Sequence, residues 1–171
     1  MKKRGWSGKR GQGVFGMSFG MIFSIILIIF ILAAAFFVIR NFLNLSECAD
    51  TGLFYDDLQN EVDKAWKSSF YQDIFEVKLP SRITYVCFGG LEKETASAGE
   101  REKRDELKSE HGSNSDNVFL YPNSKACDSR LASYNLTHVD IEKFFCIPES
   151  GGKLSVKLEK GSFDALVKVM R

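Results

Sequence analysis

The sequence predicts an α+β protein: one N-terminal transmembrane helix followed by a small extracytoplasmic domain. In that domain we expect an amphipathic helix and an antiparallel sheet that ends in a three-stranded meander. Three observations predict this class. A long uncharged apolar segment lies near the N-terminus, all four cysteines follow it, and period-two apolar patterns recur through the rest of the 171-residue chain. A chain of this length accommodates one folded domain with an appendage.

The overall charge excludes one class of partner. Lys and Arg number 23 and Asp and Glu number 22, so the net charge is +1. Nucleic-acid binding normally requires a strong basic excess, so we expect no nucleic-acid partner. The composition, 44% hydrophobic and 26% charged, also excludes a disordered or collagen-like chain.

The apolar segment has the length and composition of a membrane span. No residue from Gly11 to Ile39 is charged, and Met21–Ile39 is almost wholly apolar. About 20 apolar residues in a helix cross a hydrocarbon core of roughly 30 Å, and a single helix satisfies its own backbone there. We therefore expect residues 14–40 to form a transmembrane helix, with the lipid bilayer as its partner.

The flanking charges predict the orientation. Five basic residues precede the span, whereas only Arg40 closely follows it; the five are Lys2, Lys3, Arg4, Lys9 and Arg10. Positive residues beside a span are retained in the cytoplasm. Residues 1–13 should therefore be cytoplasmic and residues 41–171 extracytoplasmic, as in a single-pass protein of the cell membrane. Gly16 and Gly20 form a Gly-x-x-x-Gly pair that permits close helix–helix contact, so self-association through this helix is a further expectation.

Cleavage as a secretory signal is one alternative to a retained helix. Ala33-Ala34-Ala35 offers small residues of the type found at cleavage sites. A signal core has about 7–15 apolar residues, followed by a more polar stretch. Because the apolar run here continues through Ile39, the length favours a retained helix.

The N-terminus suggests a second kind of processing. Lys9-Arg10-Gly11-Gln12 ahead of a long apolar helix resembles the class III signal of archaeal prepilins. The resemblance implies cleavage after Gly11, which would make Gln12 the mature N-terminus of a pilin-like filament subunit. Pilins of this type usually carry Glu at the fifth mature position, where this chain has Gly16.

More broadly, the chain resembles uncharacterised archaeal single-pass membrane proteins. The shared features are the basic Arg-Gly-Gln start, an apolar span over Ser18–Ile29, and two short cysteine-containing strands at Val86–Phe88 and Phe145–Ile147. The resemblance implies a membrane location and no particular biochemical activity.

The four cysteines predict two disulfide bonds. No Cys-x-x-Cys occurs, so neither a thioredoxin-type redox pair nor a local zinc-binding unit is indicated. An even number of cysteines on the outer side is typical of structural disulfides. Cys87 and Cys146 lie in strand patterns, whereas Cys48 and Cys127 lie in stretches that look irregular. We therefore favour the pairs Cys87–Cys146 and Cys48–Cys127, although the spacing alone leaves all three connectivities open.

Two N-glycosylation sequons also lie on the outer side. They are Asn44-Leu45-Ser46 and Asn135-Leu136-Thr137. Asn44 is only five residues past Ile39, close to the membrane, so Asn135 is the better acceptor.

Residues 41–50 are expected to form a juxtamembrane segment, and residues 51–171 the outer domain. Apolar residues at a spacing of three to four predict an amphipathic helix over Thr51–Ser69, with Asp50 as its N-cap. Strands are expected at residues 75–79, 83–88 and 117–121, followed by the meander at residues 144–147, 153–159 and 163–169.

A charged insertion, residues 91–117, interrupts these strands. Its only large apolar residues are Leu91 and Leu107, so we expect it to bury little, either as a solvated helix or as a disordered segment.

The sequence offers no catalytic centre. His111 and His138 have no nucleophile or metal ligand at motif spacing, and no hydrolase, metalloprotease, phosphate-loop or dinucleotide motif occurs. We therefore expect no enzymatic activity, no cofactor and no metal site. The expected function is interaction or cell-envelope structure, and the sequence does not indicate which protein is the partner.

Overall fold

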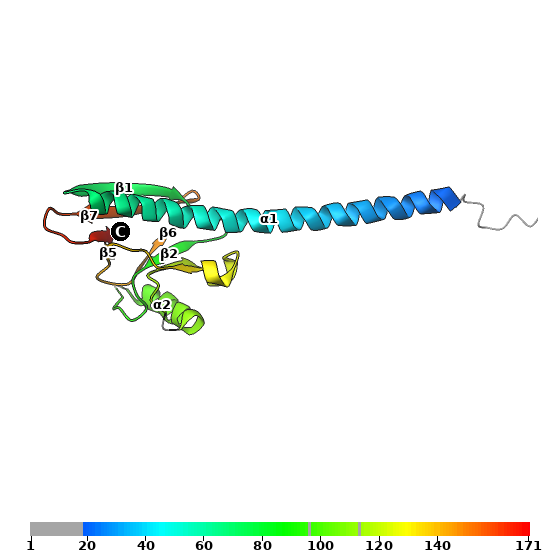
Figure 1. Cartoon of the computed structure of the whole chain (residues 1–171). Coiled ribbons are helices and arrows are strands. Elements are labelled where there is room, and N and C mark those ends of the chain that lie inside the picture. Colours follow the sequence, from blue (N-terminus) through cyan, green and yellow to red (C-terminus); the bar gives the residue numbers. More distant parts are fainter. Residues whose placement is uncertain (1–18, 96, 113) are drawn as a thin grey trace, which may run out of the picture. The chain divides into compact units, whose positions relative to one another are not determined.

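The computed structural model describes residues 19–95, 97–112 and 114–171 of the chain. The chain divides into two units, residues 1–42 and residues 43–171. Its elements make it an α+β protein with one long N-terminal apolar helix and a small sheet-containing unit (Figure 1). Gly11, Gln12 and Gly16, which carry the processing and helix-pairing predictions, lie outside the described residues.

Helix α1 (Phe19–Lys67) has 49 residues and belongs to both units. The predicted helix start at Thr51, with Asp50 as its N-cap, is therefore wrong, because both residues lie inside α1. Residues 40–50 contain neither Pro nor Gly, so nothing in them ends a helix. The Thr51 hydroxyl donates to the Glu47 carbonyl, 3.0 Å away, which is a contact within the helix. Gly52 alone costs only about 1 kcal/mol in a helix interior.

The part of α1 within residues 43–171 buries one apolar side. Phe54, Leu58, Val62 and Ala65 are all at most 1% exposed, which confirms most of the predicted amphipathic stripe. Leu53 and Trp66, which the same spacing places on that stripe, are 59% and 37% exposed instead. Burial of this side against the sheets stabilises the helix more than its intrinsic propensity does. The last turn is capped by Lys160, whose ammonium group donates to the Trp66 and Ser68 carbonyls.

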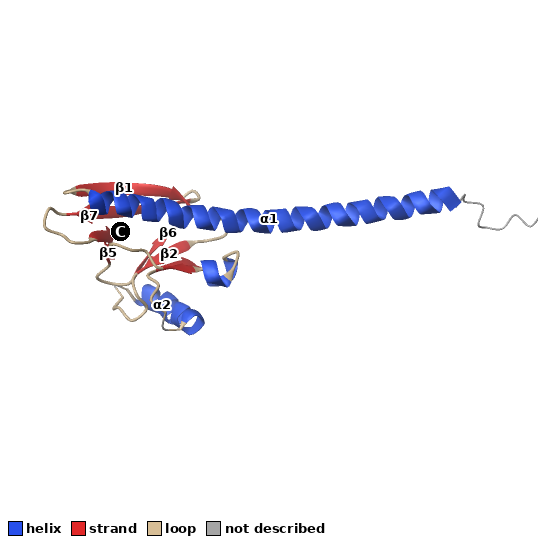
Figure 2. Cartoon of the chain, in the orientation of Figure 1, coloured by secondary structure: helices blue, strands red, loops and turns tan. Residues whose placement is uncertain are grey.

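Within the described residues, eight strands form two four-stranded sheets. The strands are drawn in red in Figure 2. The first sheet has the order β1 (Tyr71–Lys78), β7 (Lys153–Lys160), β8 (Val167–Met170) and β5 (Val139–Asp140). Its pairs are antiparallel except β5–β8, which is parallel, so the prediction of a purely antiparallel sheet is wrong at this edge.

The second sheet is antiparallel throughout. Its order is β4 (Ser133–Tyr134), β3 (Val118–Tyr121), β2 (Tyr85–Phe88) and β6 (Phe145–Pro148). Gly89 ends β2 with a φ of +108°, and a Cβ there would lie 3.0 Å from the Phe144 Cα, so both backbone and space require glycine.

The predicted terminal meander is not formed. β7 and β8 are neighbours as expected, but β6 pairs with β2 in the second sheet. The physical reason is that β6 is apolar on both faces, since Cys146 and Ile147 point to opposite sides and both are buried. Only the second sheet offers apolar partners on both sides, because it contacts α1 through one face and α2 through the other.

The charged insertion contains helix α2 (Ala98–His111), so this part of the insertion is helical and not disordered. Leu91 and Leu107 are 5% and 0% exposed and pack with Phe119, Phe144 and the Cys87–Cys146 pair in a second small core. The expectation that this insertion buries little is therefore wrong for both of its large apolar residues. Two short 3-10 turns, Asn123–Lys125 and Ser129–Leu131, precede β4.

Candidate functional site

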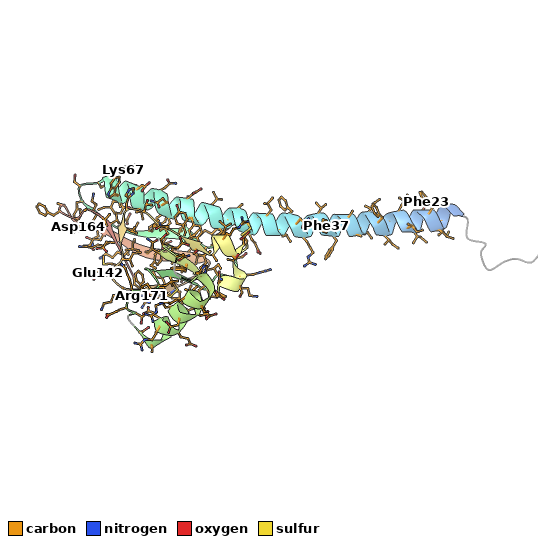
Figure 3. All side chains as sticks on the ribbon, turned by 60° about the horizontal axis from the view of Figure 1, so that its bottom comes forward. Phe23, Phe37, Lys67, Glu142, Asp164 and Arg171 are labelled. Atoms are coloured by element: carbon orange, nitrogen blue, oxygen red, sulfur yellow. A yellow bond between two sulfur atoms is a disulfide. The ribbon has the colours of Figure 1, made fainter. Side chains whose placement is uncertain are left out.

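The apolar part of α1 is exposed along its length. By length and composition, this helix is long and apolar enough to cross a membrane. Phe30, Leu32 and Phe37 are each 64–70% exposed. Figure 3 shows Phe23 and Phe37 projecting outward from the helix. Exposed apolar surface on this scale is normally covered by lipid or by another protein.

Both cysteine pairs are bonded within residues 43–171. Cys87 and Cys146 lie directly opposite each other on β2 and β6, with their Cα atoms 3.9 Å apart, and both are buried. Cys48 is bonded to Cys127, with a Cα–Cα distance of 5.2 Å. These are the two pairs favoured by the strand patterns, although Cys48 lies in α1 and not in an irregular stretch.

A pocket of about 310 Å³ opens where the end of β8 meets the start of α2. Its lining combines acidic, basic and apolar side chains: Glu100, Asp140, Glu142, Lys143, Lys168 and Arg171, with Phe145, Val169 and Met170. Glu142 and Arg171 are labelled in Figure 3, and Arg171 comes from the end of the chain that follows β8. Phe145 and Met170 are half-buried, so the pocket offers a partner both charge and apolar surface.

Glu100 is the buried charge in this pocket, with only 8% of its side chain exposed. Its Oε1 accepts hydrogen bonds from Arg171 Nη2 at 2.5 Å and from the Cys146 backbone N–H at 3.4 Å. Its Oε2 accepts from the Ser97 hydroxyl at 3.1 Å. Because a buried carboxylate is costly without such partners, this network holds α2 against β6.

Sequence reasoning missed Glu100 as a site residue, although a signal for it exists. Ser97-x-x-Glu100 is a capping box, and the Ser97 hydroxyl accepts from the Glu100 backbone N–H at 3.3 Å. That pattern would have predicted the start of α2. It would not have predicted Arg171 as the partner, since 71 positions separate the two residues.

A second polar cluster joins α1 to His138, the residue just before β5. His138 Nδ1 lies 3.0 Å from Asp63 Oδ1, and the His138 ring stacks on Trp66 with 3.9 Å between centroids. The hydrogen bond from His138 holds the pKa of Asp63 below its ordinary value. The Trp66 indole N–H donates to the Ala165 carbonyl, 3.1 Å away, so the cluster also fixes the β7–β8 loop.

A third cluster lies at the end of α1. Burial, together with a hydrogen bond to Glu61, raises the pKa of Tyr71 to about 12. Glu61 is also paired with Lys64 at 2.8 Å. These contacts fasten the first residue of β1 to the last turns of α1.

The two sequons lie in different backbone environments. Asn135 is exposed between β4 and β5. Asn44 lies in α1, where the backbone is helical.

Comparison of the chain with family models, curated proteins and solved structures finds no match.

Proposed function

We propose that this chain is a single-pass membrane protein that presents a disulfide-stabilised domain outside the cytoplasm, for interaction or cell-envelope structure. The observation that carries the proposal is the position of the cysteines relative to α1. All four follow the apolar segment, and both resulting pairs are bonded within residues 43–171. Disulfides persist in oxidising compartments, so the domain belongs on the outer side of the membrane.

The basic N-terminus supports the same orientation. Lys2, Lys3, Arg4, Lys9 and Arg10 precede the apolar segment, and only Arg40 closely follows it. By the retention of positive residues in the cytoplasm, the N-terminus is inside and the C-terminal domain outside.

A role in binding, rather than catalysis, is part of the proposal. The sequence contains no recognised catalytic motif. The pocket beside Glu100 suits an interaction role because its lining combines charges of both signs with half-buried apolar side chains. Charged rims with apolar centres are typical of protein interaction surfaces.

Protease treatment of intact cells tests the topology. We expect an added protease to remove the C-terminal domain from intact cells and to leave a cytoplasmic marker protein uncut. Full protection of the domain in intact cells, with digestion only after lysis, would contradict the proposal.

A second candidate function is that of a pilin-like filament subunit. The continuity of α1 favours it, because one unbroken helix of 49 residues runs from the apolar segment into the folded domain. In this alternative a peptidase removes residues 1–11, and the apolar helices of many copies pack together. N-terminal sequencing of the mature protein decides the matter: a start at Gln12 supports the filament subunit, and a start at Met1 or Lys2 excludes this processing.

A further inference from the structure

We propose that Asn135 is an N-glycosylation site that accepts an oligosaccharide from a lipid-linked donor, whereas Asn44 is not. This inference rests on the proposed outer location of the domain, since that is where the donor and its transferase act. The sequon alone is a weak signal, because such triplets arise by chance. The local structure around Asn135 supplies the rest of the argument.

The sequon at residues 135–137 has its two recognition residues on the exposed side. Leu136 is 2% exposed and belongs to the main core, whereas Asn135 and Thr137 are exposed. No helix or strand includes these three residues. With the middle residue turned inward, Asn135 and Thr137 both lie on the solvent-exposed side, as recognition of the triplet requires. The Thr137 hydroxyl lies 3.5 Å from His138 Nδ1, which is a long contact at an exposed position.

The surrounding structure holds this presentation in place. The Asn117 side chain forms hydrogen bonds with both backbone polar groups of Leu136. Its Nδ2 donates to the Leu136 carbonyl at 2.9 Å, and its Oδ1 accepts from the Leu136 N–H at 2.8 Å. The Thr137 N–H donates to Gln59 Oε1 at 3.0 Å. Within the part of the chain that the structure describes, the Asn135 side chain forms no hydrogen bond with another residue, so its amide remains available.

Asn44 has the same triplet but the opposite backbone environment. Residues 44–46 lie inside α1, so their backbone is helical. The triplet also begins only five residues beyond Ile39, the end of the apolar run. The two sequons are therefore a matched pair that differs in backbone conformation and in distance from the membrane segment.

The reaction is a glycosyl transfer without redox change. The Asn135 Nδ2 forms a bond to the anomeric carbon of the sugar, and the bond from that carbon to the phosphate oxygen of the polyprenyl-linked donor breaks. The lipid phosphate leaves with the bonding electron pair, and one amide proton passes to a base of the transferase. The donor and the transferase come from the cell, and this chain supplies only the acceptor.

Mass spectrometry of the full-length protein from its own membranes tests the proposal. Trypsin places the two sequons on separate peptides, residues 41–64 and residues 131–143. We expect peptide 131–143 to carry mass increments of whole sugar residues and peptide 41–64 to carry none. Asn135→Gln and Thr137→Ala should abolish the increment, Thr137→Ser should retain it, and Asn44→Gln should leave it unchanged.

Protease accessibility of the same cells separates this inference from the proposed function. An unmodified peptide 131–143 in a domain that external protease digests overturns the glycosylation site alone. An unmodified peptide in a domain that stays protected overturns the outer location as well. Sugar on peptide 41–64 instead of peptide 131–143, or sugar retained in Thr137→Ala, also overturns the assignment to this sequon.

Discussion

Replacement of Leu107 by Ala tests whether the charged segment after β2 is an integral part of the domain. Leu107 is 0% exposed and packs with Leu91, Phe119, Phe144 and the buried Cys87–Cys146 pair. A buried Leu→Ala change costs about 2–5 kcal/mol, the sum of lost transfer free energy and the cavity left behind. The second core is small, and Leu107 is the residue that α2 contributes to it, so we expect about 3 kcal/mol.

The assay is thermal unfolding of the full chain in detergent, followed by circular dichroism. For a domain the size of residues 43–171, a loss of about 3 kcal/mol lowers Tm by roughly 10 °C. Leu166→Ala is the control, since Leu166 is 41% exposed and lies in neither core cluster, and such surface changes stay within about 0.5 kcal/mol. If Leu107→Ala shifts Tm no more than the control does, the reasoning that α2 contributes to the second core is wrong.

Three further predictions follow from the disulfides and the buried charges. Protein purified from its own membrane and denatured without reductant should show no titratable thiol, and four thiols would contradict the outer location. Reduction should lower Tm markedly, because each disulfide contributes about 2–4 kcal/mol to stability. Asp63→Asn should lower the free energy of unfolding at neutral pH, because the Asp63 pKa is lower in the folded protein than in the unfolded chain and its carboxylate therefore stabilises the fold. That stabilisation is lost as the carboxylate is protonated, so the stability difference between Asp63→Asn and the native chain should shrink below about pH 4 in denaturation measured as a function of pH. Glu100→Ala should lower the free energy of unfolding in urea by about 1–3 kcal/mol, since it leaves the Cys146 N–H without its acceptor. Glu92→Ala is the control because the ion pair of Glu92 with Lys108 is exposed, and an equal loss of stability in this variant would show that the burial of Glu100 does not matter.

Local patterns in the sequence predict the helical and extended segments well. The apolar run and the stripe of Phe54, Leu58, Val62 and Ala65 both lie in α1, where their spacing places them. The alternation in residues 153–159 predicts β7, whose Leu154, Val156 and Leu158 are all fully buried.

Errors arise where long-range packing decides the outcome. The sequence around Glu149–Gly152 has the residues of a hairpin turn, yet β6 joins β2 because both faces of β6 need an apolar partner. The two-residue strands β4 and β5 are too short to produce a periodic pattern. Neither pairing could be derived from the local sequence.

The candidate site is only partly predictable for the same reason. The presence of disulfides and the Asn135 sequon can be read from residue type, whereas strand context only favours one of the three possible cysteine connectivities. The contact of Glu100 with Arg171 and the contact of Asp63 with His138 join residues that are 71 and 75 positions apart. Such pairs depend on how the two sheets and two helices pack, and no local pattern encodes them.

Cysteine labelling in intact cells tests the central claim, that residues 43–171 lie outside the cytoplasm, most directly. Phe163 is fully exposed in the loop between β7 and β8, so Phe163→Cys adds an accessible thiol without disturbing either core. We predict that a membrane-impermeant maleimide labels Phe163→Cys equally in intact and in lysed cells, whereas Ser7→Cys in the basic N-terminal segment reacts only after lysis. Labelling of Phe163→Cys only after lysis would contradict the account.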